Sequence, residues 1–499
     1  MIARWRFTSG TNFINSISKI CWILFLLTLP VSSFPFFPGD IGGGTLVRPL
    51  SIYPLIILVI LVILPRFITK PLPKTVLSFL PFVVVALISS LIAALQGIES
   101  LQGVSASARS FRALVTLGVG AAIYLSVTLW PENDDDLKLS LRWLYIGFLL
   151  ALFWGTLQTI YVVYFSPRWF DILNAAQKYI SIRKLFTNRV SGLTYEPNWF
   201  ADQISFLLLP WLLASVLSGY SVFKWRWRWV TIELMLLGWA LAIIPFTFSR
   251  AGLLVMMFLL VVGLLFFRSS KKNEQGEGAK GNFPWRRIIE AAILLIVLAL
   301  LIFIAGSRND FFARIWDYWE RAPNEGYISY VVDYFEYLGF GARFTYMETA
   351  YKIFDQHPLL GVGLGNYVFY FNENLADRPL AVVPEVLRLV VPESVGGRLI
   401  TPKNLIIRIM AETGILGLST FIAFIMAILG SALYLWFSHN KEVKFWGIGG
   451  LLGLIAFGLI AFSFDSFAIP NMWVVFGLIT AAMRLARRKS ISSGLLEEY

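Results

Sequence analysis

Basic side chains occur in the sequence at positions from which several could bind one anion. Arg189 precedes "VSGLTYEPNWFA", Arg250 ends "PFTFSR", and Arg343 begins "RFTYMETAYKIF". Lys403 lies in "TPKN", and Arg408 follows about one helical turn later. A guanidinium group holds a phosphate through two parallel hydrogen bonds and keeps its charge, so convergence of these side chains would favour a phosphorylated anion.

Each arginine also has a plain structural interpretation. Arg189 could form an exposed ion pair with Glu196 or bind an acidic lipid headgroup. Arg250 could extend its charge to the membrane interface, and Arg343 could lie on the solvated face of an amphipathic helix.

Three glutamates are candidates for the base that would deprotonate an acceptor: Glu196, Glu348 and Glu412. Glu412 lies among apolar residues in "MAETGILGL", where an unpaired carboxylate is costly, and either catalysis or an ion pair with Arg408 would account for it. Further candidates for substrate binding are Asn198, Tyr346 and Asn404. Asn198 follows a proline that is typical of the first turn of a helix, and a helix N-terminus favours a nearby anion.

The glycine-rich segment "HPLLGVGLGNY" at residues 357–367 superficially resembles a nucleotide-binding loop. Its glycines alternate instead of following G-x-G-x-x-G, and no strand–helix unit surrounds them, so we reject dinucleotide binding. A packing turn and a flexible backbone close to a substrate are both compatible with the segment.

Other catalytic patterns are missing from the sequence. It contains two histidines, His357 and His439, and no spacing typical of a metal site, a Ser-His-Asp triad or a phosphate-binding P-loop. We therefore expect neither a metal nor a cofactor.

The elements that must position these residues are membrane helices. The chain has 499 residues, of which 57% are hydrophobic and 14% charged, and its mean hydropathy is +0.70. Soluble domains are nearer about 25% charged. The net charge of +12 is spread through loops, which favours anionic membrane lipids over nucleic acid as partners. The single cysteine, Cys21, excludes a disulfide framework, and the first apolar run reads as a signal anchor.

Apolar runs of bilayer length predict an all-α polytopic fold with about 12 transmembrane helices. They are expected at residues 18–37, 50–66, 75–95, 110–130, 140–165, 198–218, 230–248, 251–267, 288–306, 405–437, 446–466 and 470–486. The run 405–437 is too long for one perpendicular crossing, so its start is expected above the membrane or dipping into it.

Lysine and arginine concentrate in alternate connections, including "RFITKPLPK", "FKWRWRW" and the tail "RLARRKS". This asymmetry predicts that both termini are cytoplasmic. Residues 1–306 then hold nine spans and an outer loop at 166–197, residues 307–404 form a large outer loop, and residues 405–499 hold three spans and a cytoplasmic tail.

The large loop should contain helices of its own, because long unstructured loops are uncommon. In its segment "RFTYMETAYKIF", helical spacing places Phe344, Met347, Tyr351 and Phe354 on one face. Its tryptophans and tyrosines favour the headgroup layer, so these helices are expected to lie on the outer surface.

Four segments together resemble the O-antigen ligase and O-antigen polymerase superfamily of bacterial membrane proteins. "RVSGLTYEPNWFA" resembles its Arg-x-x-Gly and Pro-Asn motif, and "FTFSRAGLL" its Ser-Arg-Gly/Ala turn. "RFTYMETAYKIFDQHPLLGVGLGNY" resembles its Arg-headed helix followed by Pro-x-x-Gly-x-Gly, and "TPKNLIIRIMAETGILGL" its Pro-His-Asn…Glu-x-Gly-x-x-Gly segment. The resemblance covers roughly residues 185–485; the earlier spans agree only in hydropathy.

The resemblance implies a glycosyltransferase fold of the lipid-linked-donor type that transfers glycan from undecaprenyl diphosphate on the periplasmic side, without a metal or nucleotide. Arg189, Arg250 and Arg343 would bind the diphosphate or steer the glycan. The charge argument leads to a similar expectation, because nucleotide triphosphates are absent outside the cell and a donor must bring its own leaving group, whose charge arginines would stabilise. The acceptor would be a glycan or lipid-linked glycan, with a chain-length regulator as a further candidate partner.

One position departs from the family pattern. Lys403 stands where ligases typically have histidine, and a lysine with a pKa of about 10.4 is a poor general base, although it can bind phosphate. This favours polymerisation of O-antigen or exopolysaccharide repeat units over ligation of polymer to lipid A-core. A transporter is the main rival from another class, but repeated halves and mid-membrane charges, which transporters usually show, are not evident here.

Overall fold

The computed structural model describes residues 2–37, 46–228, 230–267, 340–375 and 399–492, together with a few isolated residues. The span expected at 288–306 and most of the loop expected at 307–404 fall outside these ranges.

Helices account for nearly all regular structure in the described ranges. They are α1 (Ile2–Thr28), α3 (Ile52–Leu58), η1 (Val59–Ile63), α4 (Leu64–Thr69), α5 (Lys74–Leu95), α6 (Ala106–Leu129), α7 (Asp134–Val163), α8 (Pro167–Gln177), α9 (Pro197–Asp202), η2 (Gln203–Leu208), α10 (Leu209–Ser218), α11 (Ile232–Ile243), η3 (Ile244–Thr247), α12 (Arg250–Val262), η4 (Gly263–Phe267), α16 (Gly341–Gln356), α17 (Tyr367–Phe371), α19 (Leu405–Trp436), α20 (Lys441–Ile460) and α21 (Pro470–Ser492). A short antiparallel hairpin of β1 (Arg226–Trp227) and β2 (Val230–Thr231) precedes α11.

Every predicted span within the described ranges coincides with helix. The first span differs most: its helix begins at Ile2, well before residue 18, and ends at Thr28 and not at residue 37. Pro30 explains the early end, because the residue before a proline is disfavoured in the helical conformation.

Seven helical segments in the described residues are long and apolar enough to cross a bilayer. They are Ile52–Thr69, Lys74–Leu95, Ala106–Leu129, Asp134–Val163, Pro197–Ser218, Leu405–Trp436 and Lys441–Ile460. Three shorter apolar helices are Phe13–Thr28, Ile232–Thr247 and Arg250–Leu265. The total of about 12 spans therefore stays a prediction.

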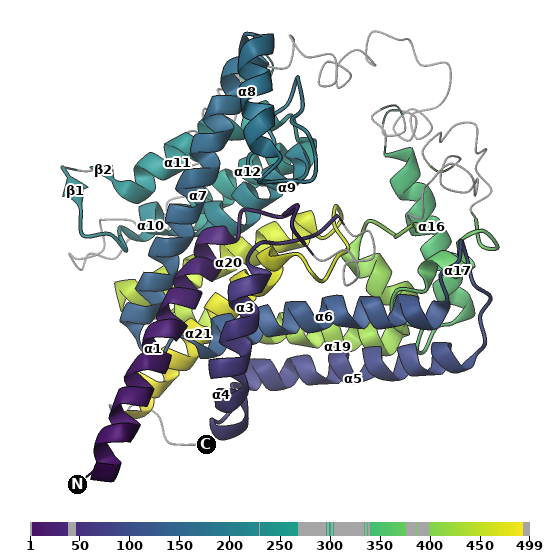
Figure 1. Cartoon of the computed structure of the whole chain (residues 1–499), viewed down its shortest axis with the longest axis horizontal. Coiled ribbons are helices and arrows are strands. Elements are labelled where there is room, and N and C mark those ends of the chain that lie inside the picture. Colours follow the sequence, from purple (N-terminus) through teal and green to yellow (C-terminus); the bar gives the residue numbers. More distant parts are fainter. Residues whose placement is uncertain are drawn as a thin grey trace, which may run out of the picture.

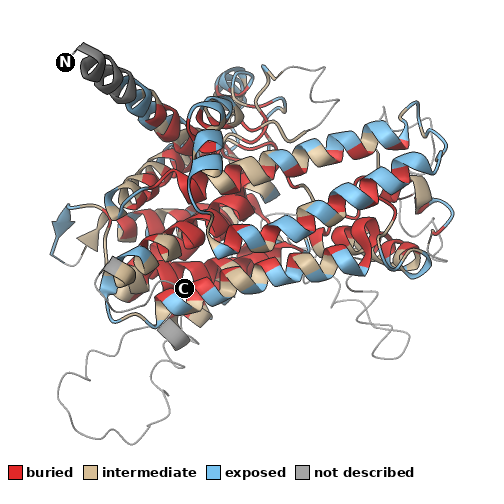
Figure 2. Ribbon diagram, turned by 90° about the horizontal axis from the view of Figure 1, so that it is seen from below, coloured by how far each residue is buried: buried red, intermediate tan, exposed pale blue. Residues whose placement is uncertain are grey.

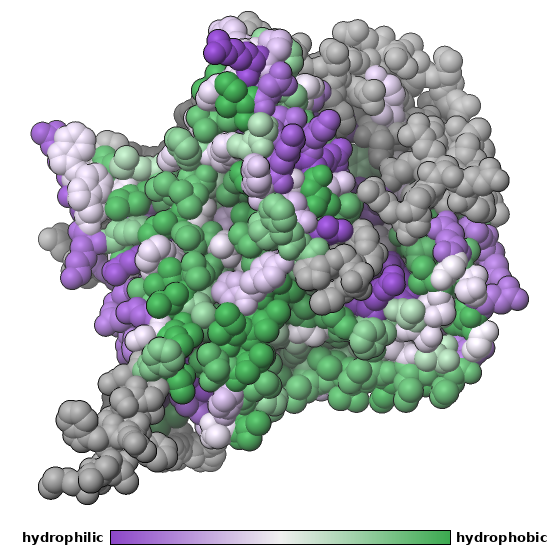
Figure 3. Space-filling model, in the orientation of Figure 1, coloured by the Kyte–Doolittle hydropathy of each residue, from purple (hydrophilic) through white to green (hydrophobic). Residues whose placement is uncertain are grey.

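The surface of the long helices is apolar. Figure 2 shows buried positions toward the interior and exposed positions along the outer sides of the helices. On α5 the exposed side chains include Leu77, Val84, Leu87 and Leu91. In Figure 3 hydrophobic side chains cover this region, whereas hydrophilic ones gather near α8 and α16. An apolar surface of this extent suits contact with lipid chains.

Helices α5, α6 and α19 run side by side, and α16 and α17 lie at one end of this group (Figure 1). Aromatic side chains fill the space between them: the ring of Phe424 lies 5.0 Å from that of Phe79 and 5.4 Å from that of Tyr124. Trp473 of α21 packs 5.4 Å from Phe79. These contacts fix α19 and α21 against the earlier helices, and so fix the polar segments that precede both.

The long helix α19 is broken near its start. Gly414 has φ 64° and ψ −166°, a conformation accessible essentially only to glycine, so a first segment ends there and a second one begins. A Cβ at this position would lie 2.3 Å from the carbonyl oxygen of Leu359. The break at Gly414 explains why the run 405–437 is longer than one perpendicular crossing of the membrane needs.

The glycine-rich loop at 357–366 bridges the break. Four backbone hydrogen bonds join the two: Val362 N to Ala411 O (3.1 Å), Gly363 N to Glu412 O (2.9 Å), Ile415 N to Pro358 O (2.8 Å) and Leu416 N to Leu359 O (3.3 Å). The loop therefore supplies the partners that a broken helix leaves unsatisfied. Its glycines have positive φ values and close neighbours, which supports the packing interpretation of this segment.

Candidate functional site

The loop before α9 carries Arg189 against the turn between η3 and α12. Its Nε donates a hydrogen bond to the carbonyl oxygen of Thr247 (2.8 Å), and Nη2 donates to the carbonyl oxygen of Phe248 (3.3 Å). Nη2 also donates to Oδ1 of Asn198 on the first turn of α9 (2.8 Å). The guanidinium group is thereby fixed between the beginnings of two membrane helices.

Polar contacts from α7 hold this loop in place. Gln158 is fully buried; its Oε1 accepts hydrogen bonds from the amides of Ser191 (2.9 Å) and Gly192 (3.0 Å), and its Nε2 donates to the carbonyl oxygen of Gly192. The amide of Val190 donates to the carbonyl oxygen of Phe246 (2.9 Å). Gln158 of α7 thus holds the loop at Ser191 and Gly192, the Ser-Gly pair of the sequence.

Arg250 is the first residue of α12, after a tight turn. Ser249 caps the helix by accepting a hydrogen bond from the amide of Gly252 (3.3 Å). A Cβ at Gly252 would lie 2.5 Å from that of Ala201, so α9 and α12 approach each other closely here. Arg250 and Arg189 are both half-buried, and their positive charges repel each other.

This arrangement disfavours the charged form of Arg189. Burial lowers its pKa to about 10; Arg250 and Arg183 act in the same direction, and Glu196 opposes them. A bound anion would relieve the repulsion, so the pair is suited to a ligand with at least two negative oxygens.

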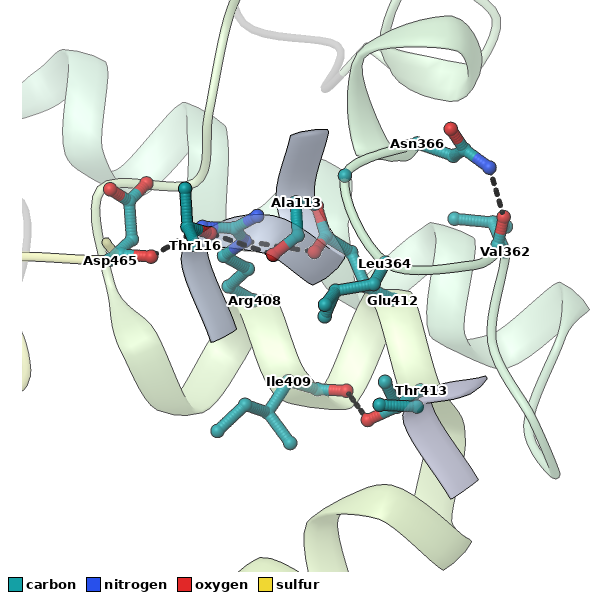
Figure 4. Close-up of polar contacts among 12 residues, drawn as sticks. Ala113, Thr116, Val362, Leu364, Asn366, Arg408, Ile409, Glu412, Thr413 and Asp465 are labelled. Atoms are coloured by element: carbon teal, nitrogen blue, oxygen red, sulfur yellow. Dashed lines mark hydrogen bonds and ion pairs between the residues drawn. The ribbon is translucent and has the colours of Figure 1, made fainter. Parts of the chain in front are cut away.

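A second group of charges lies around the start of α19 (Figure 4). Nε of Arg408 and Oε2 of Glu412 form an ion pair of 2.8 Å in which both side chains are buried. Nη1 of Arg408 donates to the carbonyl oxygen of Asp465, and Arg109 of α6 is close enough to interact electrostatically with all three residues. The ion pair with Arg408 thus supports the structural interpretation of Glu412. Breaking such a buried pair typically costs about 3–5 kcal/mol.

Lys403 and Asn404 shape the entry into α19. The amide of Lys403 donates a hydrogen bond to Oδ2 of Asp465 (2.7 Å), and Nζ of Lys403 lies 5.1 Å from the ring centre of Tyr346. Lys403 has φ 52°, which is unusual for a residue with a side chain. Asn404 caps α19, since its Oδ1 accepts a hydrogen bond from the amide of Ile407 (3.1 Å).

Arg343 connects the two groups of charges. Its Nη1 donates to the carbonyl oxygen of Phe462, in the loop that leads from α20 to Asp465. It also attracts the carboxylate of Asp202, which lies one helical turn beyond Asn198. Arg189, Arg250 and Arg343 therefore border α9, but they form no single cluster of direct contacts in the interactions described.

Other candidates have different surroundings from those expected. Glu196 pairs with Arg183 (2.8 Å), where the sequence suggested Arg189 as its partner. Glu348 is half-buried on α16. The helix α16 itself is confirmed, but the predicted face of Phe344, Met347, Tyr351 and Phe354 is not its buried face. The buried residues are Gly341, Ala342, Thr345, Tyr346, Thr349, Ala350 and Ile353. Most of these residues are small, which allows α16 to pack closely against α19.

The sequence interpretation missed Asp202 and Asp465. Both stand within apolar surroundings, in "WFADQISFLLL" and "IAFSFDSFAIP", and an acidic residue in or beside a membrane span is itself a signal of function. Arg109 was also missed, because its neighbours come from distant segments. Among the residues that the structure describes, no group of three His, Cys, Asp or Glu side chains is placed to hold a metal ion.

The apolar helices and the charges that border α9 and α19 describe a multi-pass membrane protein with polar sites at helix ends. Residues 235–422, less than half of the chain, match the family model described as O-antigen ligase. This match supports the resemblance to the O-antigen ligase and polymerase superfamily that the sequence motifs indicate. Arg250, Arg343 and Lys403 lie within the matched range, and Arg189 lies before it. No curated protein matches the chain.

Proposed function

We propose that this protein transfers a glycan from undecaprenyl diphosphate to a hydroxyl group of an acceptor on the periplasmic face of the inner membrane. The superfamily supports glycan transfer from a lipid-linked substrate. The observation that carries the proposal is the pair Arg189 and Arg250 at the meeting point of α9 and α12, in which hydrogen bonds fix Arg189. Two guanidinium groups and two helix N-termini form a positive site that fits a diphosphate.

The reaction is a displacement at the anomeric carbon of the donor. The acceptor oxygen forms a new bond to that carbon, and the bond between the carbon and the diphosphate oxygen breaks with its electron pair. Undecaprenyl diphosphate leaves with an additional negative charge, which the cationic side chains stabilise. The acceptor proton passes to a carboxylate.

Replacement of each arginine tests the proposal in membranes supplied with lipid-linked glycan. Arg189→Ala and Arg250→Ala should lower kcat for transfer at least 100-fold, the scale for losing a group that stabilises developing charge. Arg168→Ala on the exposed surface of α8 is the matched control and should leave transfer unchanged. Wild-type transfer rates in both arginine variants would contradict the proposed roles.

Polymerisation of repeat units is the reaction we favour, because Lys403 replaces the histidine that ligases typically carry. Ligation is the second candidate, and the description of the matched family model favours it. Deletion of the gene separates the two. Single repeat units on the outer lipid would indicate loss of a polymerase, whereas polymer left on its carrier lipid would indicate loss of a ligase.

A further inference from the structure

A small cavity borders α9 beside the proposed diphosphate site. It has a volume of about 40 Å³, and its lining is mainly apolar; the residues that line it include Asp202, Gln203, Asn471, Trp199 and Phe464. A cavity of this size is large enough to receive a hydroxyl group. The polar groups that line it can recognise a hydroxyl group as donor and as acceptor.

Asp202 is the charged residue of this cavity. Its side chain is buried, and among the described residues its Oδ1 has no hydrogen-bond partner. Oε1 of the neighbouring Gln203 is buried and likewise lacks one within the described ranges. Buried acceptors without partners are rare and costly, so two of them on consecutive residues that line one cavity indicate that a donor group belongs there.

The position of Asp202 relates the cavity to the site of bond breakage. Asp202 lies four residues after Asn198, on the same side of α9, and Asn198 holds Nη2 of Arg189. Arg343 attracts the carboxylate of Asp202. It also donates a hydrogen bond to the carbonyl oxygen of Phe462, which precedes the cavity-lining residues Ser463 and Phe464. Asp202 is therefore about one helical turn from Asn198, the residue that binds Arg189.

From this juxtaposition, and resting on the proposed function, we propose that Asp202 is the general base and that its cavity receives the acceptor hydroxyl group. The hydroxyl proton moves to the Asp202 carboxylate as the oxygen bonds to the anomeric carbon. The electron pair of the breaking bond goes to the diphosphate. Gln203 and Asn471 orient the hydroxyl group, and the proton later leaves Asp202 for water. Among the glutamates considered, Glu196 and Glu412 are each paired with an arginine.

The test separates donor binding from transfer in the purified full-length protein. Asp202→Asn should lower kcat for transfer about 100- to 10,000-fold, the contribution of a general base. Its affinity for undecaprenyl diphosphate, measured by calorimetry in detergent, should stay within about two-fold, which corresponds to less than about 0.5 kcal/mol. Asp202→Glu, which keeps the carboxylate, should transfer faster than Asp202→Asn. Asp171→Asn on the exposed face of α8 should match the wild type in both assays.

Two results would overturn the assignment of Asp202. Transfer by Asp202→Asn at the wild-type rate would show that no proton passes to this carboxylate. Loss of diphosphate binding in the same variant would show that Asp202 supports the cation site and is no base. An inactive wild-type protein, in contrast, would refute the proposed glycan transfer itself. Retained binding by Asp202→Asn shows at the same time that this variant is folded.

Discussion

Replacement of Gly414 by alanine should disrupt the contact between α19 and the glycine-rich loop. The backbone at Gly414 occupies a region that other residues reach only at a cost of about 1–3 kcal/mol. The added Cβ would lie 2.3 Å from the oxygen and 2.4 Å from the carbon of the Leu359 carbonyl, both backbone atoms that cannot rotate away.

The loop must therefore shift, and the four hydrogen bonds across the break weaken with it. Each backbone hydrogen bond contributes about 0.5–1.5 kcal/mol. With the strain at Gly414 itself, complete loss of the four bonds would cost about 3–9 kcal/mol of unfolding free energy. Glycan transfer should fall as well, because the same loop packs beside the Arg408–Glu412 pair.

Unfolding by sodium dodecyl sulfate in mixed micelles, followed by tryptophan fluorescence, measures this loss. Gly430→Ala provides the matched control: Gly430 lies on the same helix, and a Cβ there meets no atom within 4 Å. That variant should gain about 0.5–1 kcal/mol, because alanine is the better helix former. The reasoning fails if Gly414→Ala unfolds within about 1 kcal/mol of the wild type, the range of an ordinary point mutation.

Three further changes have defined expectations. Glu412→Gln should lower the unfolding free energy by about 3–5 kcal/mol in the same assay, because it leaves Arg408 buried without its partner. The double variant Arg408→Met and Glu412→Leu should lose less than that. A larger loss, equal to the sum of the two single replacements, would contradict the buried pair. Diphosphate affinity should decline as the pH rises through about 10, because Arg189 is cationic below its pKa and neutral above it; Arg189→Ala should lack this component, and identical pH curves would refute the assignment. Gln158→Ala should weaken diphosphate binding roughly 10-fold, or about 1.4 kcal/mol, since it releases the loop that carries Arg189; unchanged affinity would show that the loop is held by other contacts.

The sequence by itself determined the class of protein and the places where its chemistry could lie. Apolar runs of bilayer length predict helices because a backbone in lipid must satisfy its own hydrogen bonds, and this holds for the segments at 74–95 and 197–218 alike. The motifs around Arg189 and Arg250 also carry the resemblance to the superfamily, because each depends on a few neighbouring residues.

Tertiary structure alone decided which charges meet. Arg183 and not Arg189 pairs with Glu196, and Asp465 approaches Arg408 across more than fifty residues of chain. Such contacts depend on how helices pack, which the local pattern of a sequence does not encode. The same holds for the break at Gly414: excess length suggested an irregular span, but only the packed loop explains where the helix stops and what satisfies its free ends.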